Sequence, residues 1–256
     1  MDLGLKGKKA IVLGGTRGIG RAIAETLAGE GVDVAICARG EAAIPEAIAA
    51  LEAKGVKAFG GAVDIADGAA LKAWVAAAGK DLGGIDILIS NASAMTQGGD
   101  EKSWRDCLDI DVLGCLNAFE AAEPLLAEAA ASSGDAAVVS IGSVSSVNAG
   151  EVGAYGAMKA ALIHAIKGLA KKNAPRHIRA NVVSPGTVYF KGGVWNMIED
   201  NMPDFFKATM ARNPTGRMAT PQDIADAAVF LASPRSSFTT GINMIVDGAI
   251  TDRANF

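Results

Sequence analysis

Short apolar runs alternate with longer segments of helical periodicity along nearly the whole 256-residue chain. Uninterrupted apolar runs of this length are typical of strands that are buried on both faces of a sheet. Because a helical pattern separates almost every pair of successive runs, we predict parallel strands joined by right-handed helical crossovers. The fold class is therefore α/β, with a doubly wound parallel sheet of about seven strands and helices on both faces. The predicted strands are residues 9–13, 32–37, 56–63, 85–89, 136–141, 178–183 and 242–246.

The segments between these strands carry the helical patterns, with one long exception. Residues 187–220 are predicted to be irregular, and this segment is too long for an ordinary connection. Long segments of this kind are often active-site lids. No internal repeat or domain linker is evident, so residues 1–256 are predicted to form a single domain with a lid at about 187–220. Helices are predicted at about residues 20–29, 41–54, 67–82, 101–131, 155–172 and 221–232.

Composition and charge exclude several functional classes. The net charge is −4, which does not provide the broad basic surface that nucleic-acid binding requires. No stretch approaches about 20 uncharged apolar residues, so no membrane-spanning helix is expected. Cys37, Cys107 and Cys115 form no CxxC pair and lie in apolar segments, as expected for reduced thiols in a cytoplasmic protein. His164 and His177 have no ligand-like neighbours, so no metal site is predicted.

The first predicted strand ends in a glycine-rich sequence, GGTRGIG at residues 14–20. Glycine permits a tight turn and lets the backbone approach a pyrophosphate closely. The helix that follows would present unpaired N–H groups and the positive end of its dipole to that anion. The alternative is a tight strand-to-helix connection that binds nothing. Its position in the first strand–helix unit favours a Rossmann-like dinucleotide site.

The residues after the second predicted strand indicate which dinucleotide is bound. Selection for NAD usually places an acid there, to hold the ribose 2′-hydroxyl. This chain has Ala38 and Arg39 instead, and Arg17 lies within the glycine loop. Either guanidinium would suit a 2′-phosphate, so NADP(H) is favoured over NAD(H). The alternative is that Arg39 is a solvated surface residue and the protein does not distinguish NADP(H) from NAD(H).

Tyr155 and Lys159 are four residues apart in a predicted helix. At this spacing both side chains lie on one face of the helix, about 5–6 Å apart at Cβ. A lysine held there stabilises the phenolate, so the tyrosine can exchange a proton near neutral pH. The alternative is a surface tyrosine beside a solvated lysine.

Together these features resemble the short-chain dehydrogenase/reductase superfamily, over nearly the entire chain. The loop at residues 14–20 is similar to its cofactor signature, and the sequence IGSV at 141–144 is similar to its β-ketoacyl-ACP-reductase-like branch. The resemblance implies a catalytic group made of Ser143, Tyr155, Lys159 and Asp111. It implies cofactor contacts from Gly14, Thr16, Arg17, Gly18, Ile19, Gly20, Arg39, Asp64, Ile65, Asn91, Ala92, Tyr155, Lys159, Pro185, Gly186 and Val188.

Several positions depart from the family pattern. Ser90 and Ser93 replace the outer residues of the family's Asn-Asn-Ala-Gly loop. Phe190 lies near the place of a threonine that often contacts the cofactor amide. Asp111 replaces an asparagine that belongs to the proton relay. A carboxylate can accept a hydrogen bond from relay water or a backbone amide, or pair with Lys159, but it cannot donate as an amide does.

The resemblance implies an NADP(H)-dependent oxidoreductase that exchanges a hydride between the nicotinamide and a ketone or secondary alcohol. Tyr155 would act as general acid/base, and Ser143 would hydrogen-bond the same substrate oxygen. Lys159 would tune the tyrosine and hold the nicotinamide ribose. The alternative is a catalytically weak or inactive nucleotide-binding sensor or scaffold of the same fold. Asp111 and the altered loop at residues 90–93 keep this alternative open.

The predicted lid is rich in large apolar side chains, several of them at helical spacing. One interpretation is that they pack the lid onto the body. The other is that a subset lines a pocket for an apolar or aromatic ketone or alcohol. These residues are Trp195, Met197, Ile198, Met202, Phe205, Phe206 and Met210.

Two predicted helices, at residues 101–131 and 155–172, carry small apolar residues on more than one face. Such helices are usually buried on several sides. Contact between subunits would explain this pattern, and the family resemblance implies a homotetramer.

Overall fold

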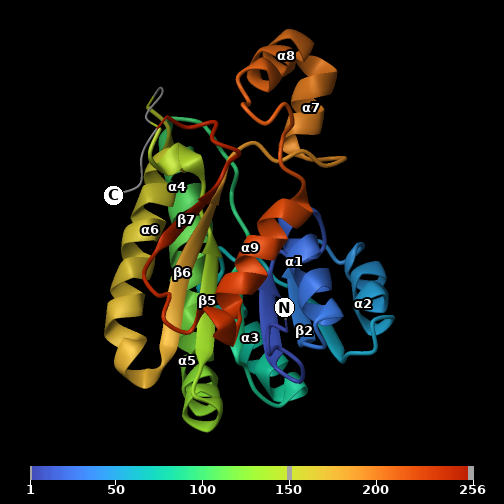
Figure 1. Ribbon diagram of the computed structural model, residues 1–256, viewed down its shortest axis with the longest axis vertical. Coiled ribbons are helices and arrows are strands. Elements are labelled where there is room, and N and C mark those ends of the chain that lie inside the picture. The colour runs from blue at the N-terminus through green and yellow to red at the C-terminus, as the bar shows by residue number, and fades with distance from the viewer. Residues whose placement is uncertain (1, 149–151, 253–256) are drawn as a thin grey trace.

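The computed structural model describes residues 2–148 and 152–252, and the strands within them form a single parallel sheet. The order is β3-β2-β1-β4-β5-β6-β7, so the direction of winding reverses between β1 and β4. The predicted doubly wound sheet is therefore confirmed (Figure 1). Folds of this kind bind ligands outside the carboxyl ends of the strands, at such a reversal. The strands are β1 (Lys9–Leu13), β2 (Asp33–Ala38), β3 (Ala58–Ala62), β4 (Ile87–Ser90), β5 (Ala136–Ile141), β6 (Ile178–Pro185) and β7 (Asn243–Val246).

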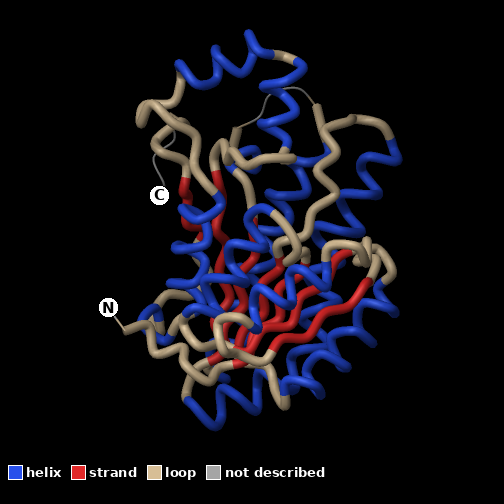
Figure 2. Tube along the Cα trace, turned by 90° about the vertical axis from the view of Figure 1, so that its right-hand side faces the viewer, coloured by secondary structure: helices blue, strands red, loops and turns tan. Residues whose placement is uncertain are grey.

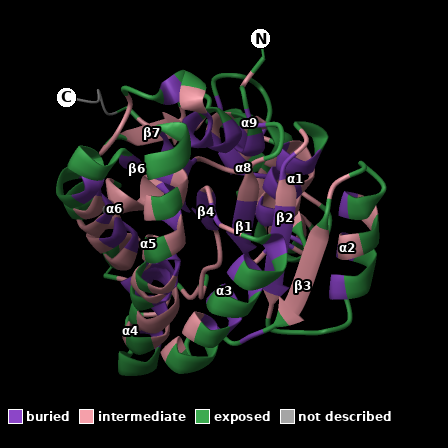
Figure 3. Ribbon diagram, turned by 90° about the horizontal axis from the view of Figure 1, so that it is seen from below, coloured by how far each residue is buried: buried purple, intermediate pink, exposed green. Residues whose placement is uncertain are grey.

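Helices cover both faces of the sheet, as predicted. The pleat of β1 shows the two layers, because Ile11 and Leu13 join one apolar cluster while Ala10 and Val12 join the other. Buried residues lie along the strands and on the inward sides of the helices (Figure 3). The helices on the first side are α3 (Gly68–Leu82), α5 (Gly114–Ser133) and α6 (Ala154–Asn173). Those on the second side are α1 (Gly18–Gly29), α2 (Ile44–Glu52) and α9 (Pro221–Ala232).

The helix predicted at residues 101–131 is three successive elements. It begins as α4 (Glu101–Cys107), continues through the π-helical turn η1 (Leu108–Leu113) and ends as α5. A π-turn adds one residue to the helical turn, which rotates the side chains that follow it, and such turns are frequent at functional sites. Within the described parts of the chain, no helix has the length and apolarity needed to cross a bilayer.

The predicted bounds are best in the middle of the sheet and poorest at its edge. The bounds of β1, β5 and α9 agree with the prediction at both ends. The strand predicted at 56–63 is shorter, because β3 is an edge strand that pairs only with β2 in the described structure. The helix predicted at 41–54 begins only at Ile44, where Pro45 occupies the first turn.

The prediction of an irregular segment at 187–220 is wrong, because this segment contains two helices, α7 (Val194–Asn201) and α8 (Pro203–Ala211). Pro203 begins α8 with a fixed backbone angle, and apolar residues recur at helical spacing in both helices. Figures 1 and 2 show α7 and α8 projecting beyond one end of the strands. We refer to residues 187–220 as the lid segment.

The lid segment is closed at its base by a short parallel bridge between Val188 and Ala219. The Tyr189 N–H donates to the Ala219 carbonyl at 2.8 Å, and the Ala219 N–H donates to the Thr187 carbonyl at 2.9 Å. We call this pairing the neck. It ties both ends of the lid segment to one point of the body.

Candidate active site

The carboxyl edge of the sheet brings the predicted site residues together. Because the strands are parallel, the residues that follow them lie along one edge. Each of the first six strands is followed there by a predicted site residue. In strand order these are Gly14, Arg39, Asp64, Asn91, Ser143 and Gly186.

Two positions of the loop require glycine, each for a different structural reason. Gly14 adopts a left-handed backbone with φ of 74°, which makes the tight turn out of β1. A Cβ at Gly20 would lie 2.1 Å from the Gly14 carbonyl oxygen, so only glycine allows α1 to pack so closely on the turn. Arg17 is the N-cap of α1, and no side chain of the described residues caps this terminus. The N–H groups of the first turn are thus available to bind an anion.

Asn91 supports this loop from the neighbouring strand β4. Its side-chain amide donates to the carbonyl of Gly14 at 3.0 Å and to that of Leu13 at 3.4 Å. The structure therefore gives Asn91 a role in fixing the glycine turn. Asp64 and Ile65 follow β3, where Ile65 is buried and Asp64 is exposed.

The two arginines predicted to select the cofactor are exposed at this edge. Arg17 lies in the glycine loop and Arg39 directly after β2. Arg21, one turn further along α1, is instead held by Glu46 at 3.0 Å and by Glu25. The structure thus leaves Arg17 and Arg39 as the cations that face solvent beside the glycine loop.

Tyr155 and Lys159 lie in the first half of α6, against the end of β5. The Lys159 Nζ atom lies 5.7 Å from the centre of the Tyr155 ring. It donates a hydrogen bond of 2.8 Å to the carbonyl of Ile141, the last residue of β5. Lys159 is only 2% exposed, so the interpretation of a solvated lysine does not hold. Ser143 is buried two residues beyond Ile141, and its Oγ atom accepts from the Ser145 N–H at 3.1 Å.

Asp111 lies in the π-turn and is buried beside the lysine. Its Oδ1 atom is 2.9 Å from Lys159 Nζ, and both side chains are almost completely buried. Its Oδ2 atom accepts a hydrogen bond of 3.0 Å from the Ala94 N–H, in the loop after β4. The lysine is not aligned as a hydrogen-bond donor, so Oδ1 has no donor within the described residues. Asp111 therefore joins the β4 loop to the Tyr–Lys pair by charge and by one backbone hydrogen bond.

The three cysteines are free and buried, as expected. Burial raises the pKa of Cys37 to about 12, and burial also raises the pKa of Cys115. Protonated thiols are poor nucleophiles and poor metal ligands. In residues 2–148 and 152–252 no cluster of His, Cys, Asp and Glu could hold a metal ion.

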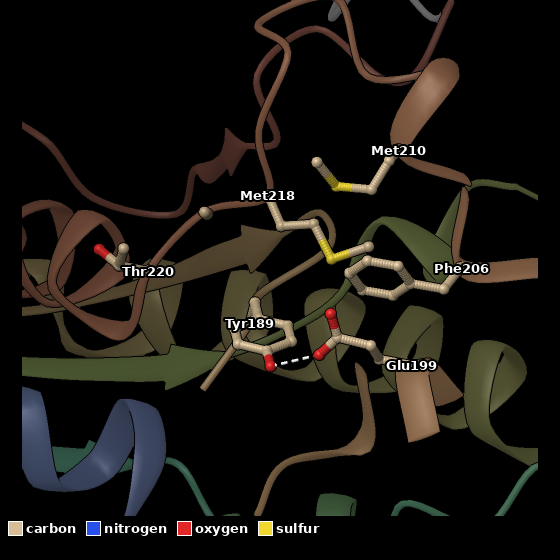
Figure 4. A pocket seen from close by; sticks show the side chains of 7 residues that line it. Tyr189, Glu199, Phe206, Met210, Met218 and Thr220 are labelled. Atoms are coloured by element: carbon tan, nitrogen blue, oxygen red, sulfur yellow. Dashed lines mark hydrogen bonds between the residues drawn. The ribbon is translucent and has the colours of Figure 1, made fainter. Parts of the chain in front are cut away.

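A cavity of about 340 Å³ lies within the lid segment, next to the neck (Figure 4). Its apolar wall includes Phe206, whose ring meets that of Tyr189 edge-on at 6.0 Å between centres. The Tyr189 hydroxyl donates to the Glu199 carboxylate, and this hydrogen bond raises the pKa of Tyr189. The lining residues are Tyr189, Glu199, Phe206, Met210, Met218, Ala219 and Thr220.

The apolar lid residues make different contacts, and neither packing of the lid onto the body nor a substrate pocket is established by them. Phe206 and Met210 line the cavity, whereas Trp195 stacks on Phe205 at 6.1 Å between ring centres. Met197 and Met202 are exposed. The cavity residues Tyr189, Glu199 and Met218 were not identified from the sequence, because they come from separate segments that share no helical spacing.

Comparison with known proteins agrees with this arrangement. The family model described as "Enoyl-(Acyl carrier protein) reductase" matches residues 14–251. Isoepoxydon dehydrogenase patN of Penicillium expansum is 35% identical over 253 residues, which are 98% of this chain and 97% of that protein. The chain belongs to the short-chain dehydrogenase/reductase superfamily.

Two further members of the superfamily show the range of similarity. The 3-oxoacyl-[acyl-carrier-protein] reductase of Staphylococcus aureus is 30% identical, with 95% of this chain and 98% of that protein aligned. The crystal structure of L-sorbose reductase from Gluconobacter frateurii, complexed with NADPH and L-sorbose, superposes with a TM-score of 0.89. It is 28% identical over 99% of this chain and 100% of that chain. Like these proteins, the chain is an oxidoreductase of the dehydrogenase/reductase type.

Proposed function

We propose that this protein is an NADP(H)-dependent enzyme that interconverts a ketone and a secondary alcohol. The observation that carries the proposal is the buried Lys159, held beside Tyr155 by the Ile141 carbonyl and by Asp111. A buried ammonium next to a phenol favours the phenolate, which is what a tyrosine needs in order to exchange protons near neutral pH. Ser143 follows the same strand and would orient the substrate oxygen.

In this mechanism the cofactor supplies hydride chemistry and the chain supplies binding, orientation and a proton. Tyr155 donates its proton to the carbonyl oxygen during reduction and withdraws it during oxidation. Ser143 hydrogen-bonds that oxygen as negative charge develops on it. Lys159 stabilises the tyrosine anion after proton donation. The loop at residues 14–20 and the N-terminus of α1 would hold the diphosphate.

The preference for NADP(H) is proposed from the charges at the cofactor edge. Arg17 and Arg39 are exposed there, and no carboxylate occupies the first position after β2 to repel a 2′-phosphate. The NADPH bound to L-sorbose reductase, which shares the fold over nearly the whole chain, supports a nicotinamide cofactor, while the preference for NADP(H) is argued from the two arginines.

The lid segment is proposed to enclose the substrate. The cavity at its neck is walled mainly by apolar groups, with the Tyr189–Glu199 pair as its polar feature. Neither Ser143 nor Tyr155 lines the cavity, so it would hold the apolar or aromatic body of a substrate and its hydroxyl groups, with the reacting carbon outside it. The relatives named for isoepoxydon and L-sorbose act on small molecules, which agrees with a small-molecule ketone or alcohol.

The assembly is proposed to be a cytoplasmic homotetramer. Outside the lid segment, two groups of exposed large apolar side chains are Leu108 and Leu113 in the π-turn, and Phe230 of α9 with Phe238 and Ile242 of the connection from α9 to β7. Two independent self-contacting patches generate a tetramer with two-fold axes, whereas one patch generates a dimer. The free buried thiols suit a reducing compartment.

The decisive experiment compares the protein with Tyr155→Phe, using NADPH, NADH and a panel of ketones. We expect turnover with NADPH and apolar or aromatic ketones, and a loss of roughly 10²–10⁴-fold in kcat for the variant. Fluorescence titration should show that the variant still binds NADPH. If NADPH binds but no carbonyl is reduced and the variant behaves identically, the protein is a nucleotide-binding sensor or scaffold instead.

A further inference from the structure

The ring of Phe190 lies directly on the glycine loop. A Cβ at Gly18 would be 2.6 Å from Phe190 Cζ and 2.9 Å from Cε2, closer than side chains approach one another. Gly18 is the first residue of α1, and its left-handed φ of 54° turns its open face outward. The tip of an aromatic ring therefore occupies the space that a side chain would take at the N-terminus of α1.

The same ring also touches the start of the lid helices. A Cβ at Gly193 would lie 2.8 Å from Phe190 Cε1 and 2.9 Å from Cζ. Gly193 is the N-cap of α7, and its N–H donates to the Phe190 carbonyl at 3.0 Å. The outer edge of the ring thus contacts both the glycine loop at Gly18 and the N-cap residue of α7, Gly193.

Among the loop glycines, Gly18 is the one expected to lie against the bound pyrophosphate, which needs the space where a side chain would otherwise be. Gly14 is needed for its turn and Gly20 for close packing, as described above. The middle glycine of such loops lets the backbone approach the pyrophosphate. An aromatic ring carries no acceptor for the N–H groups of a helix N-terminus, so it cannot replace the anion there. A diphosphate bound at this loop as proposed would need the face of Gly18 that the Phe190 ring covers.

We propose that Phe190 is a gate that couples binding of the dinucleotide to movement of the lid. This inference rests on the proposed cofactor site. To admit the diphosphate the ring leaves Gly18, and because Gly193 packs against the same ring, the start of α7 moves with it. Phe190 follows the neck residue Tyr189 directly, so a rotation at this one point changes the direction of the whole lid.

The gate makes a specific prediction for cofactor affinity. If the ring covers Gly18 for most of the time, the measured affinity is reduced by the fraction of molecules that are open. Phe190→Ala should therefore bind NADPH more tightly, by about tenfold if the ring covers Gly18 nine-tenths of the time. Phe190→Leu keeps apolar bulk in a shorter side chain that should not cover Gly18, so it should also bind NADPH more tightly. This second variant guards against a folding defect in Phe190→Ala.

A ligand without a diphosphate separates the gate from a general effect on the fold. Adenosine 2′-monophosphate carries the adenosine half of NADP but no diphosphate, so its affinity should be unchanged in both variants. Hydrogen exchange of peptides within residues 191–217 supplies the second readout. NADPH should alter exchange there in the parent protein and much less in Phe190→Ala.

Phe205→Ala is the matched control, because Phe205 is a half-exposed lid phenylalanine that stacks on Trp195 away from the glycine loop. It should leave NADPH affinity unchanged. The gate is refuted if Phe190→Ala and Phe190→Leu bind NADPH equally well or more weakly than the parent. A parent protein that binds no dinucleotide at all would refute the proposed function instead, which keeps the two failures distinct.

Discussion

The residue that most distinguishes this site is Asp111. Its carboxylate lies 2.9 Å from the buried Lys159 ammonium, so the positive charge beside Tyr155 is partly offset. Burial of an ion pair costs desolvation, which the Ile141 carbonyl and the Ala94 N–H offset only in part, because Asp111 Oδ1 has no aligned donor within the described residues. In the proposed mechanism, Asp111 would therefore reduce the effect of the Lys159 charge on Tyr155.

Replacing Asp111 with asparagine tests this balance. Without the carboxylate, Lys159 stabilises the Tyr155 phenolate more strongly, so the pH midpoint of activity should move to lower pH. Alcohol oxidation, which needs the phenolate, should extend to lower pH. Ketone reduction, which needs the phenol, should be lost at lower pH than in the parent. Profiles of kcat against pH in both directions measure the shift.

Asp106→Asn is the control for this substitution, because Asp106 lies five residues earlier and pairs with Lys102 at the surface. It should leave the pH profile unchanged. A profile of Asp111→Asn that coincides with that of the parent would contradict the tuning role of Asp111.

At the scale of elements, the lid segment ends at the N-terminus of α9, where two reciprocal hydrogen bonds form a cap. The Thr220 hydroxyl accepts from the Asp223 N–H, while the Asp223 carboxylate accepts from the Thr220 N–H at 2.7 Å. Arg217 adds a two-pronged ion pair with the same carboxylate, at 2.7 Å and 2.9 Å. This capping box fixes where the lid segment returns to the body as α9.

Removal of the cap should destabilise the protein measurably. Thr220→Ala should lower the free energy of unfolding by about 1 kcal/mol at neutral pH, as other lost N-caps do. Urea unfolding is the measurement. Thr239→Ala, an exchange of the same type outside any helix N-terminus, is the control, and an equal loss in both variants would argue against capping.

The free energy of unfolding at acidic pH should depend on Asp223. The hydrogen bonds from Arg217 and from the Thr220 N–H hold the pKa of Asp223 below its usual range. A lowered native pKa stabilises the fold above the unfolded value of about 4, and this contribution is lost as the pH falls below it. The difference in unfolding free energy between the parent and Asp223→Asn should therefore be largest at neutral pH and shrink in acid.

The elements also show how far the sequence predicts the structure. Strands such as β1 and β5 were predicted fully, because central parallel strands are continuous apolar runs. Helical spacing predicted that Tyr155 and Lys159 share one face of a helix, but their catalytic role was implied only by the family resemblance. The contact of Phe190 with Gly18 and the Tyr189–Glu199 pair were not predicted, because both depend on how the lid segment turns at its neck. Spacing along the chain carries no information about that turn.

For the whole molecule, the proposed assembly rests on exposed apolar residues. Phe238 is fully exposed, and Ile242 from the same connection and Phe230 near the end of α9 are each about a third exposed. Large apolar side chains gathered in one segment indicate a surface that is covered in solution.

Phe238→Glu should therefore break one of the two proposed interfaces and convert the tetramer to a dimer. Light scattering after size-exclusion chromatography measures this, with an expected mass near four times that of the chain for the parent and half of that for the variant. Met197→Glu, at a comparably apolar and exposed position in the lid segment, should leave the mass unchanged. A parent protein that is monomeric at micromolar concentration would refute the tetramer.

The neck has a consequence for how such a protein changes over time. Both ends of the lid segment meet at the bridge between Val188 and Ala219. The number of residues between them can therefore change without altering the sheet. The entropy of closing a loop grows only slowly with its length, so insertions and deletions there cost little. If the lid segment encloses the substrate as proposed, exchanging this one contiguous stretch would change the substrate while leaving the glycine loop and the Tyr155–Lys159 pair in place.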